Sequence, residues 1–341
     1  MFEKLRKIPS PEEFIKLVPL SNNLKELKSA RDEEIKKVVT GETNKFLVII
    51  GPCSADNEDA VCDYVHRLAA VQEKTRDKLV IVPRVYTNKP RTTGEGYKGM
   101  LHQPDPESAP NMVEGIVAIR RMHIKAISES GLSAADEMLY PDNLPYVDDM
   151  LSYIAVGARS VENQQHRLTA SAIDVAVGMK NPMSGDLAVM LNSIQAAQTA
   201  HDFIYNGHEV KTAGNPLAHA IMRGSVNRHG ESIQNYHYED LLSAHEQYVK
   251  RKLVNPMVIV DANHSNSKKQ YKEQIRIAHE VLYSRKKNCD LKKLVRGLMI
   301  ESYLEEGSQP VGGGVYGKSI TDACIGWADS ERLIYYIADN C

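Results

Sequence analysis

The chain has 341 residues, 42% hydrophobic and 25% charged, a composition typical of a folded globular protein. Its 42 basic and 44 acidic residues give a formal net charge of −2, which offers no overall attraction to nucleic acid or an anionic membrane. A membrane span and a signal-peptide core are both absent from the sequence, and five scattered cysteines without CxxC spacing argue against a disulfide framework, so we expect a cytoplasmic protein.

Residues 1–45 are predicted to form a helical extension. Apolar residues such as Ile35 and Val38 recur there at helical spacing, and Gly41 fits the position after a helix C-terminus. No Ser/Gly-rich linker follows, so we expect the remaining chain, residues 46–341, to form one catalytic domain.

Beyond residue 45, short apolar runs rich in Val and Ile alternate with longer amphipathic stretches, the pattern of repeated βα units. The runs are continuous, as expected of strands buried on both faces. There are eight of them: Phe46–Cys53, Leu79–Val85, Leu132–Glu137, Ser152–Arg159, Asp174–Lys180, Leu217–Arg223, Pro256–Asp261 and Leu294–Glu301. They predict a (β/α)8 TIM barrel, which takes about 250 residues. We place the surplus in the N-terminal helices and between Asn181 and Pro216, with a short insertion between strands five and six.

Each run ends at, or close to, a side chain that can bind a metal or an anion or transfer a proton. These residues are Cys53, Arg84, Glu137, Arg159, Lys180, Arg223, His264 and Glu301. In a barrel they would converge on one mouth, where the loops after the strands build the active site. Strand ends that meet solvent are often polar, so any single position is ambiguous. The set as a whole, however, does not have the residue composition of an ordinary solvent-exposed surface.

Four of these residues are cations suited to phosphate and carboxylate oxygens: Arg84, Arg159, Lys180 and Arg223. The pattern predicts a site for a phosphorylated acid. A second phosphate site is predicted in the loop Asn88-Lys89-Pro90-Arg91-Thr92-Thr93-Gly94, which combines two cations with two hydroxyls, although a solvated turn would have the same composition.

A mixed group of thiol, imidazole and carboxylates indicates one divalent transition metal, such as Mn, Fe, Co or Zn, rather than Mg or Ca. Its members are Cys53, His264, Glu301 and Asp322. Taken singly, Cys53 could be a small buried hydrophobe, His264 a loop residue, and Asp322 the partner of Ser319 in a helix capping box. Their convergence in a barrel is what favours a metal site.

The segment Gly312-Gly313-Gly314-Val315-Tyr316-Gly317-Lys318-Ser319 matches the Walker A pattern. A nucleotide-binding loop of this kind requires a buried strand before it and a nucleotide-binding sheet after it. Neither is predicted here, so we do not expect ATP binding.

Seven motifs, taken in order, resemble the type I DAHP synthase family, alpha subgroup (DAHP is 3-deoxy-D-arabino-heptulosonate 7-phosphate). They are Gly51-Pro52-Cys53-Ser54, Lys89-Pro90-Arg91-Thr92-Thr93, Gly157-Ala158-Arg159-Ser160, Val177-Gly178-Met179-Lys180-Asn181, Met222-Arg223-Gly224, Asp261-Ala262-Asn263-His264-Ser265-Asn266-Ser267 and Gly317-Lys318-Ser319-Ile320-Thr321-Asp322-Ala323-Cys324. The resemblance runs from about residue 10 to the C-terminus. It implies a (β/α)8 barrel transferase that condenses phosphoenolpyruvate with erythrose 4-phosphate and water, releasing phosphate, in the first step of the shikimate pathway to aromatic amino acids.

The resemblance also implies roles for individual residues. The metal ligands would be Cys53, His264, Glu301 and Asp322, with phosphoenolpyruvate held by Arg84, Lys89, Ala158, Arg159, Lys180 and Arg223. Erythrose 4-phosphate would be held by Lys89, Arg91, Thr92 and Asp322. The metal would act as a Lewis acid on the aldehyde, and Glu137 would orient the attacking water. Lys89 would donate a proton, with a pKa lowered by neighbouring arginines. The enzyme would form a homodimer or homotetramer.

Three alternatives remain open at this point. The aldehyde could be arabinose 5-phosphate or an aminated erythrose phosphate, although Lys89-Pro90-Arg91-Thr92 favours erythrose 4-phosphate. The chain could also be a non-catalytic paralogue, although no predicted metal ligand is lost.

The sequence departs from the subgroup pattern at Asn263 and at His102-Gln103-Pro104-Asp105. The segment Phe203–Arg223, where regulated members carry a hairpin, looks short and predicts weak or absent inhibition by aromatic amino acids, unless other residues rebuild the site.

Overall fold

The computed structural model describes all residues, 1–341, and its centre is a barrel of eight parallel strands. The strands are β1 (Phe46–Gly51), β2 (Leu79–Pro83), β3 (Ala134–Glu137), β4 (Leu151–Val156), β5 (Ala176–Lys180), β8 (Ala218–Met222), β11 (Val258–Asp261) and β12 (Val295–Glu301). Their order around the barrel is β2-β1-β12-β11-β8-β5-β4-β3. Between β2 and β3 the closure is a single parallel bridge from Arg84 to Ala135. The (β/α)8 barrel prediction is confirmed.

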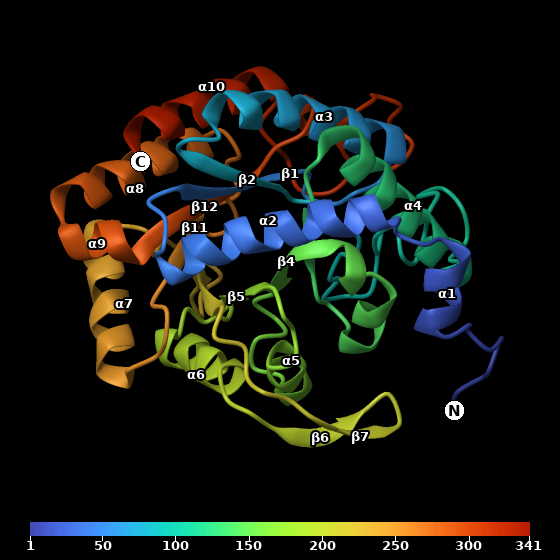
Figure 1. Ribbon diagram of the computed structural model, residues 1–341. Coiled ribbons are helices and arrows are strands. Elements are labelled where there is room, and N and C mark those ends of the chain that lie inside the picture. Colours follow the sequence, from blue (N-terminus) through green and yellow to red (C-terminus); the bar gives the residue numbers. More distant parts are fainter.

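Ten α-helices surround or close this barrel (Figure 1). They are α1 (Pro11–Leu17), α2 (Asn22–Thr40), α3 (Glu58–Thr75), α4 (Met112–Ser130), α5 (Gln164–Ala170), α6 (Leu187–Ala197), α7 (Tyr238–Arg251), α8 (Glu273–Lys287), α9 (Cys289–Leu294) and α10 (Trp327–Asn340). After β3 the chain forms two short 3₁₀ helices instead, η1 (Pro141–Tyr146) and η2 (Asp148–Met150). None of the helices is long and apolar enough to cross a membrane.

Helix α2 lies across one end of the barrel (Figure 1), and its apolar face joins the barrel interior. Ile35, Val38 and Val39 are fully buried in one cluster with inward-facing residues of the strands, such as Val80. Gly41 ends α2 in the left-handed conformation with φ of 79°, which a glycine adopts without steric cost. The N-terminal extension therefore shuts the face opposite the carboxyl ends of the strands.

The surplus residues lie where they were expected, in the N-terminal helices and in a short insertion between the fifth and sixth barrel strands, and also in two places that were not expected. Between barrel strands β5 and β8 there is only one addition to the regular helix α6, a hairpin of β6 (Asp202–Tyr205) and β7 (His208–Lys211). Two further additions were not located from the sequence: the hairpin of β9 (Ser225–Val226) and β10 (Ser232–Ile233), and the pair β13 (Glu305–Ser308) and β14 (Lys318–Ser319). These strands are too short to produce a periodic pattern.

The Walker-like segment runs from the loop after β13 to the end of β14. No barrel strand directly precedes the segment. No helix begins at its end, because Lys318 and Ser319 form the short strand β14. The structure thus has none of the strand, loop and helix arrangement that a phosphate-binding loop of this kind requires.

Candidate active site

A cavity of about 350 Å³ opens at the carboxyl ends of the barrel strands. It is lined by Cys53, Arg84, Tyr86, Lys89, Pro90, Arg91, Glu137, Gly157, Ala158, Arg159, Lys180, Met183, Arg223, Val226, Ser232, His264, Ser265, Lys269 and Asp322. Eleven of the predicted site residues are in this wall. Glu301 lies directly beneath it, 1% exposed, while Thr92 is exposed outside it.

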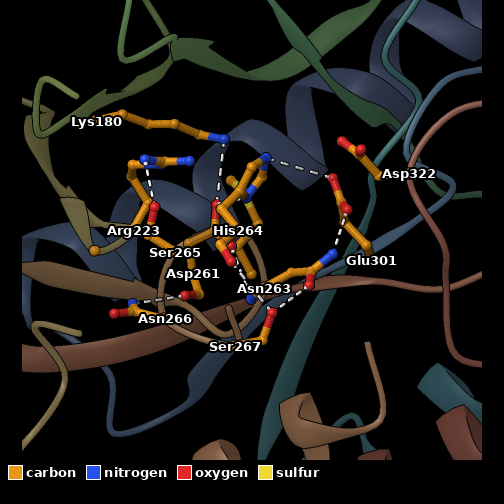
Figure 2. A network of polar contacts seen from close by, with 12 residues as sticks. Lys180, Arg223, Asp261, Asn263, His264, Ser265, Asn266, Ser267, Glu301 and Asp322 are labelled. Atoms are coloured by element: carbon orange, nitrogen blue, oxygen red, sulfur yellow. Dashed lines mark hydrogen bonds and ion pairs between the residues drawn. The ribbon is translucent and has the colours of Figure 1, made fainter. Parts of the chain in front are cut away.

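The predicted metal ligands meet on one side of the cavity. The Cys53 thiol and the carboxylates of Glu301 and Asp322 offer donor atoms that lie within 4.8 Å of one another. His264 stands just outside this cluster, with its Nε2 atom 3.7 Å from Oε1 of Glu301 (Figure 2). These residues come from the ends of β1 and β12 and from the loops that follow β11 and β14, which only the barrel closure brings together.

Two residues that the sequence analysis did not assign to the site hold the metal-ligand candidates in place. Oδ2 of Asp261, buried at the end of β11, lies 2.9 Å from Nδ1 of His264, which leaves Nε2 facing the cavity. Asn263 donates a hydrogen bond from Nδ2 to Oε2 of Glu301. Carboxylates and amides behind metal ligands commonly fix ligand orientation in this way. The signal for Asp261 was its position as the last residue of an apolar run.

Three of the four cations of the predicted phosphate site, Arg84, Lys180 and Arg223, are buried and individually partnered. NH2 of Arg84 lies 3.0 Å from Oε1 of Glu301, and Nζ of Lys180 lies 3.3 Å from Oδ2 of Asp261. Arg223 donates to the Ser265 hydroxyl at 3.1 Å (Figure 2). Burial would raise the pKa of Asp261, but His264, Lys180 and Arg223 outweigh this effect and hold the pKa below its ordinary range. The Asp261 carboxylate therefore stays ionised next to the cations of the site.

Lys89 has a different environment from the one expected. Its Nζ atom lies 2.7 Å from Sγ of Cys53 and 3.1 Å from Oδ2 of Asp322, rather than among arginines. Burial lowers the pKa of Lys89, but the negative charge of Cys53, Asp322 and Glu301 outweighs it and raises the pKa above its ordinary value. The expectation of a lowered pKa is therefore wrong for this arrangement, because acidic groups surround the ammonium.

Glu137 points into the cavity from the end of β3 and rests against the backbone of the neighbouring strand's loop. A Cβ atom on Gly157 would lie 2.0 Å from Oε1 of Glu137, so only glycine leaves room for this carboxylate. Ala158 and Arg159 follow Gly157 in the cavity wall, with the Arg159 side chain exposed at the mouth. The Gly157-Ala158-Arg159 sequence thus places a cation two residues after the glycine that contacts Glu137.

The loop after β2 contributes a second group of cations. Lys89, Pro90 and Arg91 line the cavity, and Arg91 donates from Nε to the Tyr97 carbonyl at 2.8 Å. Thr92 and Thr93 are exposed beyond this point. The structure brings two of the predicted phosphate-cradle cations into the cavity but does not bring in the hydroxyls.

Five further residues line the cavity without having been predicted from the sequence: Tyr86, Met183, Val226, Ser232 and Lys269. Tyr86 lies two residues after Arg84 on the same inward-facing side. Val226 and Ser232 come from the β9–β10 hairpin, whose backbone is attached to the loop after β5 by the Val226 N–H to Met183 carbonyl hydrogen bond of 2.8 Å. No sequence pattern predicted that this hairpin folds over the barrel mouth.

The fold and this cavity together define a (β/α)8-barrel enzyme whose site is built for anionic ligands. The comparisons with known proteins then identify its family. The chain belongs to the DAHP synthetase I family, whose model matches residues 21–334.

Similar proteins are found along nearly the whole chain. A phospho-2-dehydro-3-deoxyheptonate aldolase of Haemophilus influenzae is 36% identical over 99% of this chain and 92% of its own length. The Phe-sensitive protein of that name from Escherichia coli strain K12 is 34% identical over 99% of this chain and 95% of its own length. A solved phospho-2-dehydro-3-deoxyheptonate aldolase of Francisella tularensis superposes with a TM-score of 0.92 at 27% identity, covering 100% of this chain and 98% of that one.

Proposed function

We propose that this protein condenses phosphoenolpyruvate with erythrose 4-phosphate and water in a metal-dependent reaction, giving DAHP and inorganic phosphate. The names of the similar proteins support this reaction and, with it, a place at the start of the shikimate pathway. The observation that carries the proposal is the single cavity in which two cation groups and the thiol, imidazole and carboxylate group face one another.

Phosphoenolpyruvate would bind at the cations near the barrel axis. Arg84 and Lys180 are buried and already partnered by Glu301 and Asp261, so their charges are held in position before the ligand arrives. Arg159 and Arg223 provide planar donor groups on the same side. Fixed cations of this kind both position the phosphate and stabilise it as it leaves, without reorganising during the reaction.

The candidate metal site fits a divalent transition metal. Its donors combine one thiol, one imidazole and two carboxylates, and Oε1 of Glu301 is buried without a hydrogen bond. A cation is already attracted to this group, since the Lys89 ammonium lies between Cys53 and Asp322. Cys53, His264, Glu301 and Asp322 would hold the metal. When bound, such a metal supplies Lewis acidity toward an aldehyde oxygen.

Lys89 and Glu137 would handle the protons. Lys89 keeps its proton because acidic neighbours raise its pKa, so its Nζ atom presents an ammonium to an oxygen that becomes negatively charged. Glu137 lies against Gly157 in the cavity wall, where its carboxylate can accept a hydrogen bond from the water that attacks C2 of phosphoenolpyruvate.

Erythrose 4-phosphate would bind beside the loop after β2. Arg91 lines the cavity and is held by the Tyr97 carbonyl, so its remaining guanidinium donors are available to a phosphate. Asp322, about one third exposed, would contact the sugar hydroxyls. Thr92 remains a predicted ligand, one that needs the loop to move toward the cavity.

The proposal is tested by measuring loss of phosphoenolpyruvate with erythrose 4-phosphate, with arabinose 5-phosphate and with no aldehyde, each with and without a chelator. The expected result is turnover with erythrose 4-phosphate alone, abolished by the chelator and restored by a divalent transition metal. Equal turnover with arabinose 5-phosphate would contradict the choice of aldehyde. Turnover that survives exhaustive chelation would contradict the metal requirement, and no turnover under any condition would favour a non-catalytic paralogue.

A further inference from the structure

Tyr86 occupies an unusual position among the buried cations of the cavity. It is 1% exposed, and it follows Arg84 by two residues at the end of β2, so both side chains face the barrel axis. The Arg84 guanidinium carbon lies 3.7 Å from the centre of the Tyr86 ring, and Nζ of Lys180, from β5, lies 5.7 Å from the same centre. One aromatic ring therefore contacts two cations that come from strands on different sides of the cavity.

The ring supplies an interaction that the rest of the site does not. Nε of Arg84 is buried and has no hydrogen-bond partner, and its guanidinium stacks on the ring instead. The negative face of an aromatic ring attracts a cation, and the attraction is strongest where water is excluded. Lys180 has one carboxylate partner, Asp261, and the ring is its other neighbour of opposite electrostatic character.

The hydroxyl group of Tyr86 contributes little to this arrangement. Its hydrogen-bond contact is with Sδ of Met299 at 3.7 Å, a weak acceptor. The backbone is fixed independently, because the Tyr86 carbonyl accepts from Ala55 N–H at 2.8 Å and Thr87 N–H donates to Asp136 at 2.9 Å. The ring is therefore held still, and its face is the part that meets the cations.

We infer that Tyr86 is a positioning residue for phosphoenolpyruvate, whose ring face sets the placement of Arg84 and Lys180. This inference rests on the proposed function. The residue acts through the two cations rather than by touching the reacting atoms, since its ring is 1% exposed and packs against the Arg84 guanidinium. Loss of the ring leaves both cations free to move toward their carboxylates Glu301 and Asp261 and away from the substrate.

The first test compares Tyr86→Phe with Tyr86→Leu. Phosphoenolpyruvate binding is measured by calorimetry without aldehyde, and the Michaelis constants of both substrates are then measured for each variant. Tyr86→Phe keeps the ring and should bind within about twofold of the parent protein, whereas Tyr86→Leu should bind about tenfold more weakly. The Michaelis constant for erythrose 4-phosphate should not change. Parent-like phosphoenolpyruvate binding by Tyr86→Leu would overturn the inference.

A second test does not depend on the Leu variant folding. Phenylalanines with increasing numbers of ring fluorines are incorporated at position 86, which preserves shape while it weakens the negative face of the ring. Phosphoenolpyruvate affinity should fall stepwise with each added fluorine, and a flat series would overturn the inference. A parent protein that does not turn over phosphoenolpyruvate with erythrose 4-phosphate would instead overturn the proposed function, and the inference with it.

Discussion

The ammonium of Lys89 lies 2.7 Å from the thiol of Cys53, so a predicted proton donor is in direct contact with a predicted metal ligand. The same ammonium lies 3.1 Å from Asp322. Acidic donor groups in a buried site need a cation nearby, because uncompensated charge is costly to bury. The contact places one cation among the proposed metal donors, and it supports the proposal that this group binds a metal cation.

Replacement of Cys53 by serine should remove bound metal and activity together. A serine hydroxyl reproduces neither the charge nor the softness of a thiolate. Metal content by atomic absorption should fall by about tenfold or more relative to the parent protein. Cys62→Ser is the matched control, because Cys62 is buried in α3, where its thiol contacts the Met122 carbonyl rather than a metal donor. Full metal content in Cys53→Ser would disprove the assignment.

Arg159→Ala and Arg91→Ala should affect different substrates. Both side chains line the cavity. Arg159 belongs to the loop after β4, whereas Arg91 belongs to the loop after β2. Loss of a charged hydrogen bond predicts about tenfold or greater increases in the Michaelis constant, for phosphoenolpyruvate in the first variant and for erythrose 4-phosphate in the second. Steady-state kinetics with each substrate varied in turn measures this. Equal effects on both substrates would mean that the cations form one shared site.

A buried carboxyl group beside the site should make stability depend on pH. Asp136 is fully buried in β3, where burial raises its pKa to about 7 despite hydrogen bonds from Thr87 and the Glu137 N–H. In the unfolded chain the group ionises near its ordinary value of 3.8. Between pH 3.8 and about pH 7, Asp136 is therefore protonated in the folded state and ionised in the unfolded state. The contribution of this group to the free energy of unfolding is full below pH 3.8 and is lost as the pH rises toward about 7.

Asp136→Asn should reduce this dependence. An amide keeps the oxygen that accepts from Thr87 N–H and Glu137 N–H, and its NH2 group can donate to the Thr87 hydroxyl, which donates to Oδ2 of Asp136 in the parent protein. Between about pH 5 and about pH 7, the unfolding free energy of the variant relative to the parent should rise by about 2 kcal/mol. Urea unfolding at the two pH values measures it. Parallel pH profiles for the two proteins would show that Asp136 ionises normally.

Inhibition by phenylalanine, tyrosine or tryptophan should be weak or absent. The β6–β7 hairpin is only two four-residue strands with a tight turn at Asn206-Gly207. A cavity of about 360 Å³ lies beside its Tyr205, with Lys28, Asp148 and Asp174 in its wall, and this cavity is where a rebuilt effector site would lie. Titration of each amino acid at subsaturating phosphoenolpyruvate tests the prediction, and strong saturable inhibition by any one of them would contradict it.

The barrel could be predicted from the sequence because its strands are buried on both faces. Runs such as Phe46–Cys53 are continuously apolar for this reason, and each observed barrel strand lies within, or one residue from, a predicted run. The convergence of Cys53 and His264 followed from barrel closure alone. Their separation in the sequence carries no information about distance, but a closed parallel sheet brings all carboxyl ends to one face.

Features that depend on tertiary contacts were not predictable. The acidic surroundings of Lys89 arise because Asp322, from a loop more than two hundred residues away, folds back over Cys53. Tyr86 resembles an ordinary core aromatic residue in the sequence, and its contact with Lys180 exists only across the closed barrel. The β9–β10 hairpin has too few residues in strands to produce a periodic pattern.

We propose that one cavity holds both the metal and phosphoenolpyruvate, and this proposal can be tested in a single experiment. Its most direct test is a crystal structure of the protein with manganese and phosphoenolpyruvate, in which anomalous scattering locates the metal. We expect one metal peak bound by Cys53, His264, Glu301 and Asp322, with the substrate phosphate contacting Arg159, Lys180 and Arg223. A metal peak elsewhere, or a phosphate bound away from these three cations, would contradict it.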